Sequence, residues 1–222
     1  MLNTSLFKYV SYQSGPRDYS NIISLDVSQN KQITNIESLV GDNLPNLKEL
    51  NINSSSVSQL NNIPSQLRVL NAENVNLSSI QFPENCVVER ISLKNSTIST
   101  NISFNQLPNL KYLDLTNCTI TGNIVLANLP AIETFIINNT KFQGNIIIQN
   151  NVNINRFDFS GLSINGIVFD GNDIDIKVLN FNSTTFTQDR INLDAISKNV
   201  EEIYFNNCKN LKHIEMTSGK NF

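Results

Sequence analysis

The sequence predicts a repeat solenoid of the α/β class that is dominated by β-structure. In this fold a curved parallel sheet forms a concave face, and short strands, 3-10 turns and loops with little helix form the convex side. Three observations predict it. One template of four apolar anchors recurs nine times; its first half alternates apolar and polar residues; and its second half is rich in β-branched residues.

The template is clearest in the stretch from Asn109 to Leu126, where Leu110, Leu113, Leu115 and Ile120 stand at offsets 0, 3, 5 and 10. The nine copies begin at Ile22, Leu47, Leu67, Val88, Leu110, Ile132, Ile154, Ile176 and Val200. From Val88 to Ile176 every first anchor lies 22 residues after the one before it. Such regularity predicts stacked identical units rather than several domains.

Each copy opens with a predicted strand. Leu113 and Leu115 alternate with Tyr112, Asp114 and Thr116, as a strand with one buried face requires. We expect each strand to pair in parallel with the strand of the next copy, because no copy can bury its apolar side alone.

The segment after each strand carries little helix signal. Gly122, Gly144 and Gly166 each follow the fourth anchor by two residues and lead into runs such as "NIVL" and "NIII". β-branched residues favour extended chain over helix. We therefore expect a second short strand here rather than a helix.

This pattern resembles the leucine-rich repeat family, whose unit of about 20 to 29 residues carries LxxLxLxxN/CxL. The resemblance covers residues 22–216, and the glycines resemble the LxGxI of the plant-type subclass. It implies that the ninth residue of each unit turns inward and bonds the backbone of the adjacent loop. In chain order these residues are Asn30, Ser55, Ser96, Cys118, Thr140, Thr184 and Cys208. Val75 and Leu162 depart from the pattern, so we expect those two copies to lack this bond.

The chain divides into three predicted segments. Residues 1–21 form an N-terminal cap or edge strand, residues 22–216 form a solenoid of about nine repeats, and residues 217–222 form a C-terminal tail or truncation point. The stretch "LKHIEM" before the tail is predicted to open a tenth copy or to close the array as a strand.

Composition excludes several functional classes. The 222 residues carry a net charge of −3 with acids and bases interspersed, so no basic stripe favours nucleic acid. No apolar run approaches the ~18 residues that a membrane span needs. The three cysteines, Cys86, Cys118 and Cys208, are predicted to be free thiols rather than a disulfide framework.

Catalytic motifs are absent from the sequence, which favours a non-enzyme without a cofactor. His213 is the single histidine, and no GxSxG, P-loop or HExxH occurs. Asp114 and Asp158 fall two copies apart, at ~9.6 Å, but solvated carboxylates are the commoner interpretation. A Ca²⁺ site is the less favoured interpretation of "DGNDID", beside a plain Asp-Gly turn, and would use Asp170, Asn172, Asp173 and Asp175.

The outward strand positions carry the functional prediction. We expect a non-catalytic binding module that recognises a protein, peptide or glycan on its concave face, as part of a larger surface or secreted protein. The predicted contact residues are Tyr112, Asp114, Ile136, Asn138, Asp158 and Tyr204. Two alternatives remain open: a structural spacer or adhesin stalk, and a cytoplasmic leucine-rich repeat scaffold or effector. Eight glycosylation sequons occur, about as many as the asparagine content alone would produce, so they do not separate these locations.

Overall fold

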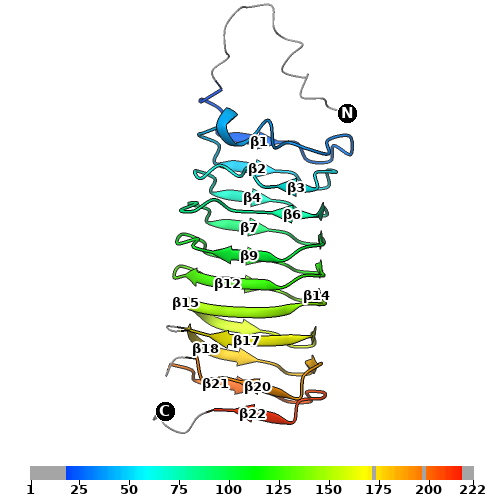
Figure 1. Cartoon of the computed structure of the whole chain (residues 1–222), viewed down its shortest axis with the longest axis vertical. Coiled ribbons are helices and arrows are strands. Elements are labelled where there is room, and N and C mark those ends of the chain that lie inside the picture. The colour runs from blue at the N-terminus through cyan, green and yellow to red at the C-terminus, as the bar shows by residue number, and fades with distance from the viewer. Residues whose placement is uncertain (1–18, 172–173, 197–198, 217–222) are drawn as a thin grey trace, which may run out of the picture.

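The computed structural model describes residues 19–171, 174–196 and 199–216. The chain winds into a parallel β-solenoid whose turns stack along the long axis of the molecule (Figure 1). The strands of successive turns lie in three series, which we call ladders 1, 2 and 3 in the order in which a turn enters them. Most neighbouring strands of a series pair, and each series is interrupted at one or more places where they do not. The predicted repeat architecture with a spacing of about 22 residues is confirmed.

The ladders take their strands from regular positions in each turn. Ladder 1 contains β1 (Ser24–Asp26), β2 (Glu49–Asn51), β4 (Val69–Asn71), β7 (Arg90–Ser92), β10 (Tyr112–Asp114), β13 (Thr134–Ile136), the end of β15 (Asn145–Asp158), the end of β18 (Ile174–Asn180) and β21 (Glu202–Tyr204). Ladder 2 contains β5 (Asn76–Leu77), β8 (Thr97–Ile98), β11 (Thr119–Ile120), β14 (Lys141–Phe142), β16 (Ser163–Ile164) and β19 (Thr185–Phe186). Ladder 3 contains β3 (Gln59–Leu60), β6 (Ser79–Ile80), β9 (Ile102–Asn105), β12 (Ile124–Leu129), the start of β15, β17 (Gly166–Asp170), β20 (Arg190–Asn192) and β22 (His213–Glu215).

The predicted register of ladder 1 is confirmed at its centre. Leu113 lies opposite Ile91 of β7 and Phe135 of β13, and all three side chains point into the core. Leu115, the next inward anchor, is also fully buried. The apolar anchors of the repeat therefore form the continuous core of the solenoid, as the alternation predicted.

The ninth residue of the unit turns inward in most copies, as the resemblance implied, whereas Asn30 of the first copy is exposed. The Cys118 thiol donates to the carbonyl of Leu93 at 2.9 Å, and the Thr184 hydroxyl donates to the carbonyl of Phe159 at 2.7 Å. Each bond satisfies a buried backbone acceptor beside the turn that follows the strand. Small side chains with a donor are favoured here because the space is enclosed by the neighbouring turn.

Left-handed turns explain much of the asparagine content, about one residue in six. Asparagine tolerates a positive φ better than most residues other than glycine. One column of such residues follows ladder 1 and a second follows ladder 3; the asparagines among them are Asn74, Asn95, Asn117, Asn139 and Asn207 in the first column and Asn85, Asn128 and Asn150 in the second. The repeated corner of the solenoid thus selects this residue type.

Gly122 and Gly144 lie where one turn comes very close to the turn before it. A Cβ atom on Gly122 would stand 2.4 Å from the carbonyl oxygen of Thr100, and one on Gly144 would stand 2.3 Å from the carbonyl oxygen of Gly122. Real side chains cannot approach backbone this closely, so these positions require glycine. The chain then enters β12 and β15, which confirms the second strand expected after these glycines.

Strand β15 connects two ladders without interruption over 14 residues. Its first half pairs with β12 and β17 in ladder 3, and its second half pairs with β18. Beside its end the core becomes aromatic: successive ring centroids of Phe135, Phe157, Phe159, Phe181 and Phe205 lie 5.4, 5.6, 5.1 and 5.0 Å apart. The first pair is edge-to-face and the others are stacked, and both arrangements at these distances add attraction beyond the burial of their area.

Some expectations about class and ends require correction or lie outside the described residues. The α/β class is not supported, because the described residues contain one 3-10 helix, η2 (Gly41–Asn43), and no α-helix. No helix in that part of the chain is long and apolar enough to cross a membrane. The "LKHIEM" stretch forms β22, which pairs with β20. Residues 1–18 and 217–222 lie outside the description, so the cap and tail stay predictions, as does the curvature of the sheet.

Candidate functional site

The candidate surface is the outward side of ladder 1, which we call the ladder 1 face. All six predicted contact residues lie on it or just after one of its strands: Tyr112 and Asp114 in β10, Ile136 in β13, Asn138 after β13, Asp158 in β15 and Tyr204 in β21. Asp114 lies opposite Ile136, whereas Asn180 lies between Asp158 and Tyr204. The structure therefore brings together Tyr112, Asp114 and Ile136 at the centre, and separates Asp158 and Tyr204 from each other by one strand.

Asp114 is the centre of a polar cluster. Its Oδ1 accepts hydrogen bonds from the Thr116 backbone N–H at 2.9 Å and from the Thr116 hydroxyl at 2.6 Å. Its Oδ2 accepts the Tyr112 hydroxyl at 2.8 Å and lies 3.3 Å from the Lys94 ammonium. The Arg90 guanidinium lies over the Tyr112 ring, 4.1 Å from its centroid. These five residues form what we call the Asp114 cluster.

The burial of Asp114 corrects a sequence-based expectation. An outward strand position predicted a solvated carboxylate. Instead Asp114 is only 2 % exposed, because Tyr112 and Lys94 cover it. Asp114 also accepts a hydrogen bond from the N–H two residues onward, which forms a local turn at the end of the strand. The residue is thus a structural member of the surface as well as a candidate contact.

The electrostatics of the cluster keep Asp114 ionised. Burial by itself raises the pKa of Asp114, but the hydrogen bonds from Thr116, Tyr112 and Lys94 outweigh it, and the net pKa lies below its ordinary value. The pKa of Tyr112 is raised by burial first and then by its bond to this carboxylate. The pKa of Lys94 is raised by its hydrogen bond to Asp114 and by the charge of that carboxylate. At neutral pH the cluster therefore carries a carboxylate beside the Lys94 ammonium, with the Arg90 guanidinium over the neighbouring Tyr112 ring.

We predict that protonation of Asp114 destabilises the folded state at low pH. Its pKa is lowered in the folded state, whereas in the unfolded chain an aspartate titrates near ~3.9. The stabilisation is complete above about pH 5 and is lost as the pH falls through the lowered folded-state pKa. The free energy of urea unfolding, measured from neutral pH into acid, should fall less steeply in Asp114→Asn than in the wild type. Equal slopes for the two proteins would contradict this role.

Asp158 repeats part of this arrangement in a more open setting. Its Oδ1 accepts the Ser160 backbone N–H at 3.0 Å, and its Oδ2 forms an ion pair with Arg156 at 3.0 Å. The Asn180 amide also donates to it, from the next strand. Burial raises the pKa of Asp158, but the bonds from Ser160, Arg156 and Asn180 lower it overall. Like Asp114, Asp158 uses its carboxylate to close the end of its own strand.

The remaining predicted contacts are simpler. Ile136 is half-buried and Asn138 is exposed. The Tyr204 hydroxyl donates to Glu202 at 2.8 Å, and this bond raises the pKa of Tyr204. Sequence reasoning did not single out Arg90 or Lys94, although Arg90 precedes Tyr112 by one 22-residue period. The repeat register was the signal that could have placed Arg90 beside that ring.

The predicted Ca²⁺ ligands are only partly described, since Asn172 and Asp173 lie outside the described residues. Asp170, at the end of β17, accepts a hydrogen bond from Gln149 at 2.9 Å. Asp175, in β18, accepts one from Asn199 at 3.1 Å. Within the described ranges no group of three or more His, Cys, Asp or Glu side chains could hold a metal ion. The calcium interpretation therefore gains no support from the residues that can be placed.

The three cysteines are free thiols, as predicted. Cys86 and Cys118 are buried and Cys208 is half-buried. Burial raises the pKa of Cys118 to about 11, which keeps its thiol protonated and able to donate to Leu93. His213 is exposed on β22, opposite Arg190 of β20. None of these residues joins the ladder 1 face.

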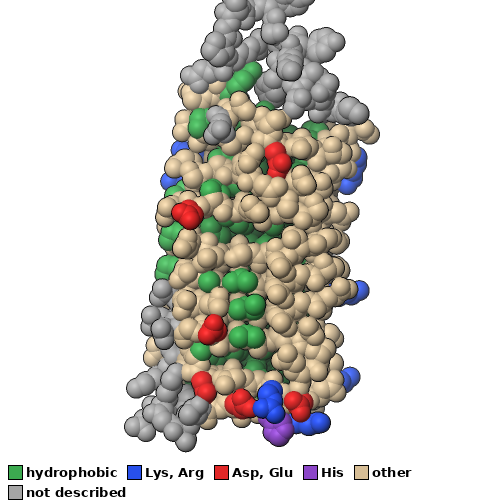
Figure 2. All heavy atoms as spheres, in the orientation of Figure 1, with side chains coloured by type: hydrophobic (Ala, Val, Ile, Leu, Met, Phe, Trp, Pro, Cys, Tyr) green, Lys and Arg blue, Asp and Glu red, His purple; other side chains and the backbone are tan. Residues whose placement is uncertain are grey.

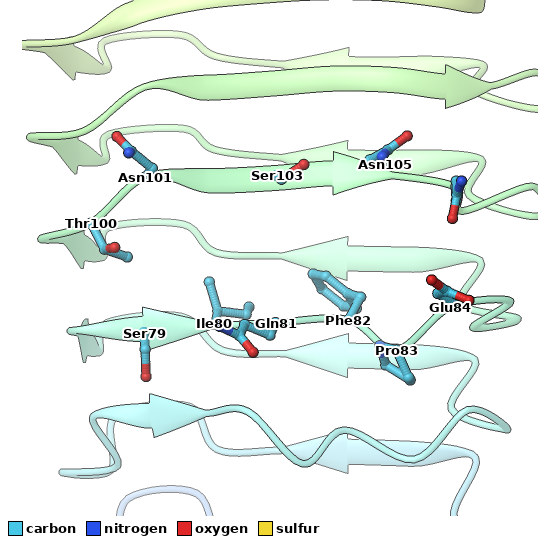
Figure 3. Close-up of a pocket in the computed structure, with 11 residues that line it drawn as sticks. Ser79, Ile80, Gln81, Phe82, Pro83, Glu84, Thr100, Asn101, Ser103 and Asn105 are labelled. Carbon is cyan, nitrogen blue, oxygen red and sulfur yellow. The ribbon is translucent and has the colours of Figure 1, made fainter.

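An open groove of 430 Å³ lies on ladder 3 between β6 and β9 (Figure 3). Among the described strands no pairing joins these two, although the same two turns pair in ladders 1 and 2. Pro83 contributes to the gap, because it has no N–H to donate. The groove is lined mainly by polar side chains and brings together no catalytic set.

Comparison with family models, with curated proteins and with solved structures gave no match for this chain. The fold itself therefore defines the class, which is a repeat protein built as a parallel β-solenoid.

Proposed function

We propose that the chain is a solenoid of the leucine-rich repeat type and serves as a non-catalytic recognition module. Its ladder 1 face would bind a protein, peptide or glycan. The repeated LxxLxLxxN/CxL pattern supports the family, together with the inward hydrogen bonds of ninth residues such as Cys118 and Thr184. A surface that varies from turn to turn on a constant core is the usual basis of recognition in such arrays.

The Asp114 cluster is the observation that carries the proposal. The Tyr112 ring is fixed by its bond to Asp114 on one side and by Arg90 over its face. Tyr and Arg are the residue types that most often dominate interface energies. Because the ring is already ordered, binding would cost little side-chain entropy. Ile136 adds apolar area beside this anchor, in the adjacent strand.

Replacement of Tyr112 tests the proposal directly. Binders can be selected with the wild-type protein from a random-peptide phage library and, separately, from a glycan array. Affinity for a selected binder should fall at least about thirtyfold in Tyr112→Ala, which corresponds to about 2 kcal/mol for a central aromatic anchor. Thr119→Ala, a half-buried outward site on ladder 2, is the control and should bind as the wild type does. Circular dichroism checks that both variants are folded.

Two results would contradict the proposed site. One is a selected binder whose affinity is unchanged in Tyr112→Ala. The other is high glycan occupancy at Asn95, Asn117 and Asn138 in protein from its native host, because sugars there would obstruct the ladder 1 face. Peptide mass spectrometry measures this occupancy.

A structural spacer or stalk is the second candidate, and amide ladders along the stack favour it. The Asn117 amide donates to Asn95 one turn earlier at 3.0 Å, and the Asn123 N–H bonds the Asn101 side chain at 2.8 Å. Such ladders stiffen an array without creating a ligand site. A spacer would yield no specific binder in either selection and would tolerate Tyr112→Ala.

A further inference from the structure

The outward face of ladder 3 carries one apolar row on an otherwise polar surface. Val125 lies opposite Ile147, and Ile147 lies opposite Val168, so three β-branched side chains stack in register on β12, β15 and β17. Val168 is 43 % exposed, and the other two are partly exposed. Figure 2 shows green side chains gathered in this region of the face, surrounded by polar surface. We call these three residues the apolar row.

Hydrogen-bonded polar side chains flank the apolar row on both sides. On one side the Asn145 N–H bonds the Asn123 side chain at 2.8 Å, continuing the ladder that begins at Asn101. On the other side the Gln149 amide bonds Asp170 at 2.9 Å. The side chains that flank the row are therefore ordered in advance. A flat, rigid sheet face of this kind suits packing against another sheet at about 10 Å.

We propose that the apolar row is the centre of a weak twofold dimer between two copies of this chain. The sequence of the row, Val–Ile–Val, reads the same in both directions. A twofold axis along the strand direction at Ile147 would place Val125 of one copy opposite Val168 of the other, and Ile147 opposite Ile147. Interfaces with twofold symmetry require this self-complementarity.

Charge also favours a second copy. The apolar row and its flanking columns contain no cation, and their only acid is Asp170 at one corner. In the arrangement above, Asp170 faces Ala127 of the other copy, so no like charges meet despite the net charge of −3 on each chain. A basic or acidic partner would find nothing complementary to its charge here.

The size of the patch predicts a weak dimer. Three strands at ~4.8 Å spacing and five residues at ~3.3 Å each cover about 240 Å² of sheet face. Stable interfaces bury about 800 Å² per partner, so this one belongs to the weak class. Dimerisation should therefore depend visibly on protein concentration.

Sedimentation velocity over a concentration series is the first test, with a variant that keeps the shape of the row. Val125→Thr, Ile147→Thr and Val168→Thr together retain β-branched side chains while removing the apolar contact. This triple variant should raise the dimer dissociation constant at least about tenfold and should melt as the wild type does. Thr119→Ser on ladder 2 is the matched control and should associate as the wild type does.

Site-specific crosslinking locates the interface independently. In a Cys208→Ser background, Ile147→Cys should form a dimer with a short bismaleimide, because residue 147 of each copy faces the other across the axis. Thr119→Cys, on another face of the same stack, should stay monomeric. The proposal is overturned if the wild type is a monomer at every concentration, if the triple variant associates equally well, or if both cysteine variants crosslink to the same extent.

Discussion

Leu113→Asp should unfold the centre of the stack at neutral pH. Leu113 is fully buried, between Ile91 and Phe135 of the neighbouring turns. A carboxylate placed there has no partner, and leaving a buried charge unpaired costs several kcal/mol. That cost is comparable to the whole stability of a typical domain, about 5–15 kcal/mol. Far-UV circular dichroism should show loss of β-structure, and the thermal transition should vanish or fall steeply.

Thr119→Asp is the control for this substitution. Thr119 lies in the same turn, on ladder 2, with a half-buried outward side chain. The same charge is introduced there, but water can reach it, so stability should change by no more than about 0.5 kcal/mol. A Leu113→Asp protein that melts like this control would overturn the inward register of ladder 1.

Asp114→Ala should lower the free energy of unfolding by about 2–4 kcal/mol. Its removal deprives the Thr116 N–H, the Thr116 hydroxyl and the Tyr112 hydroxyl of their acceptor, and leaves Lys94 without its ion-pair partner. Urea unfolding at neutral pH measures the loss. A change below about 0.5 kcal/mol would show that the cluster is solvated and unimportant to the fold.

Asp158→Ala provides the comparison. Its side chain is 34 % exposed, against 3 % for Asp114, although both carboxylates accept a hydrogen bond from the N–H two residues onward. Water can replace more of its contacts, so the loss should be closer to about 1 kcal/mol. The difference between the two variants isolates the contribution of burial.

The stack and its register could be predicted because they depend on apolar spacing alone. Leu113 and Leu115 repeat the offsets of every other copy, and only one parallel register places all such anchors inside. The inward orientation of the ninth residue could also be predicted, since small side chains with a hydrogen-bond donor, such as Cys118, recur at that position. These features depend on the repeat pattern alone and not on the conformations of exposed side chains.

The burial of Asp114 could not be predicted, because it depends on how two long side chains fold over it. Tyr112 lies in the same strand as Asp114, Lys94 follows the adjacent strand β7, and either side chain could instead extend into water. The open groove beside Pro83 likewise lies where β6 and β9 are unpaired, although the same two turns pair in ladders 1 and 2. The α/β label is not supported, because the segments after Gly122, Gly144 and Gly166 form strands, as their β-branched residues predicted.

The direction of the hydrogen bonds between turns has a mechanical consequence. The strands lie across the long axis of the stack, so these bonds run along it (Figure 1). A force that pulls two distant turns apart would act on the hydrogen bonds between neighbouring turns. The bonds between one pair of turns would break before those between the next pair. Each 22-residue turn released would add up to ~77 Å of chain in place of a ~4.8 Å step. Under tension the molecule would therefore lengthen in discrete steps, one turn at a time. Each step would lower the tension on the turns that remain folded.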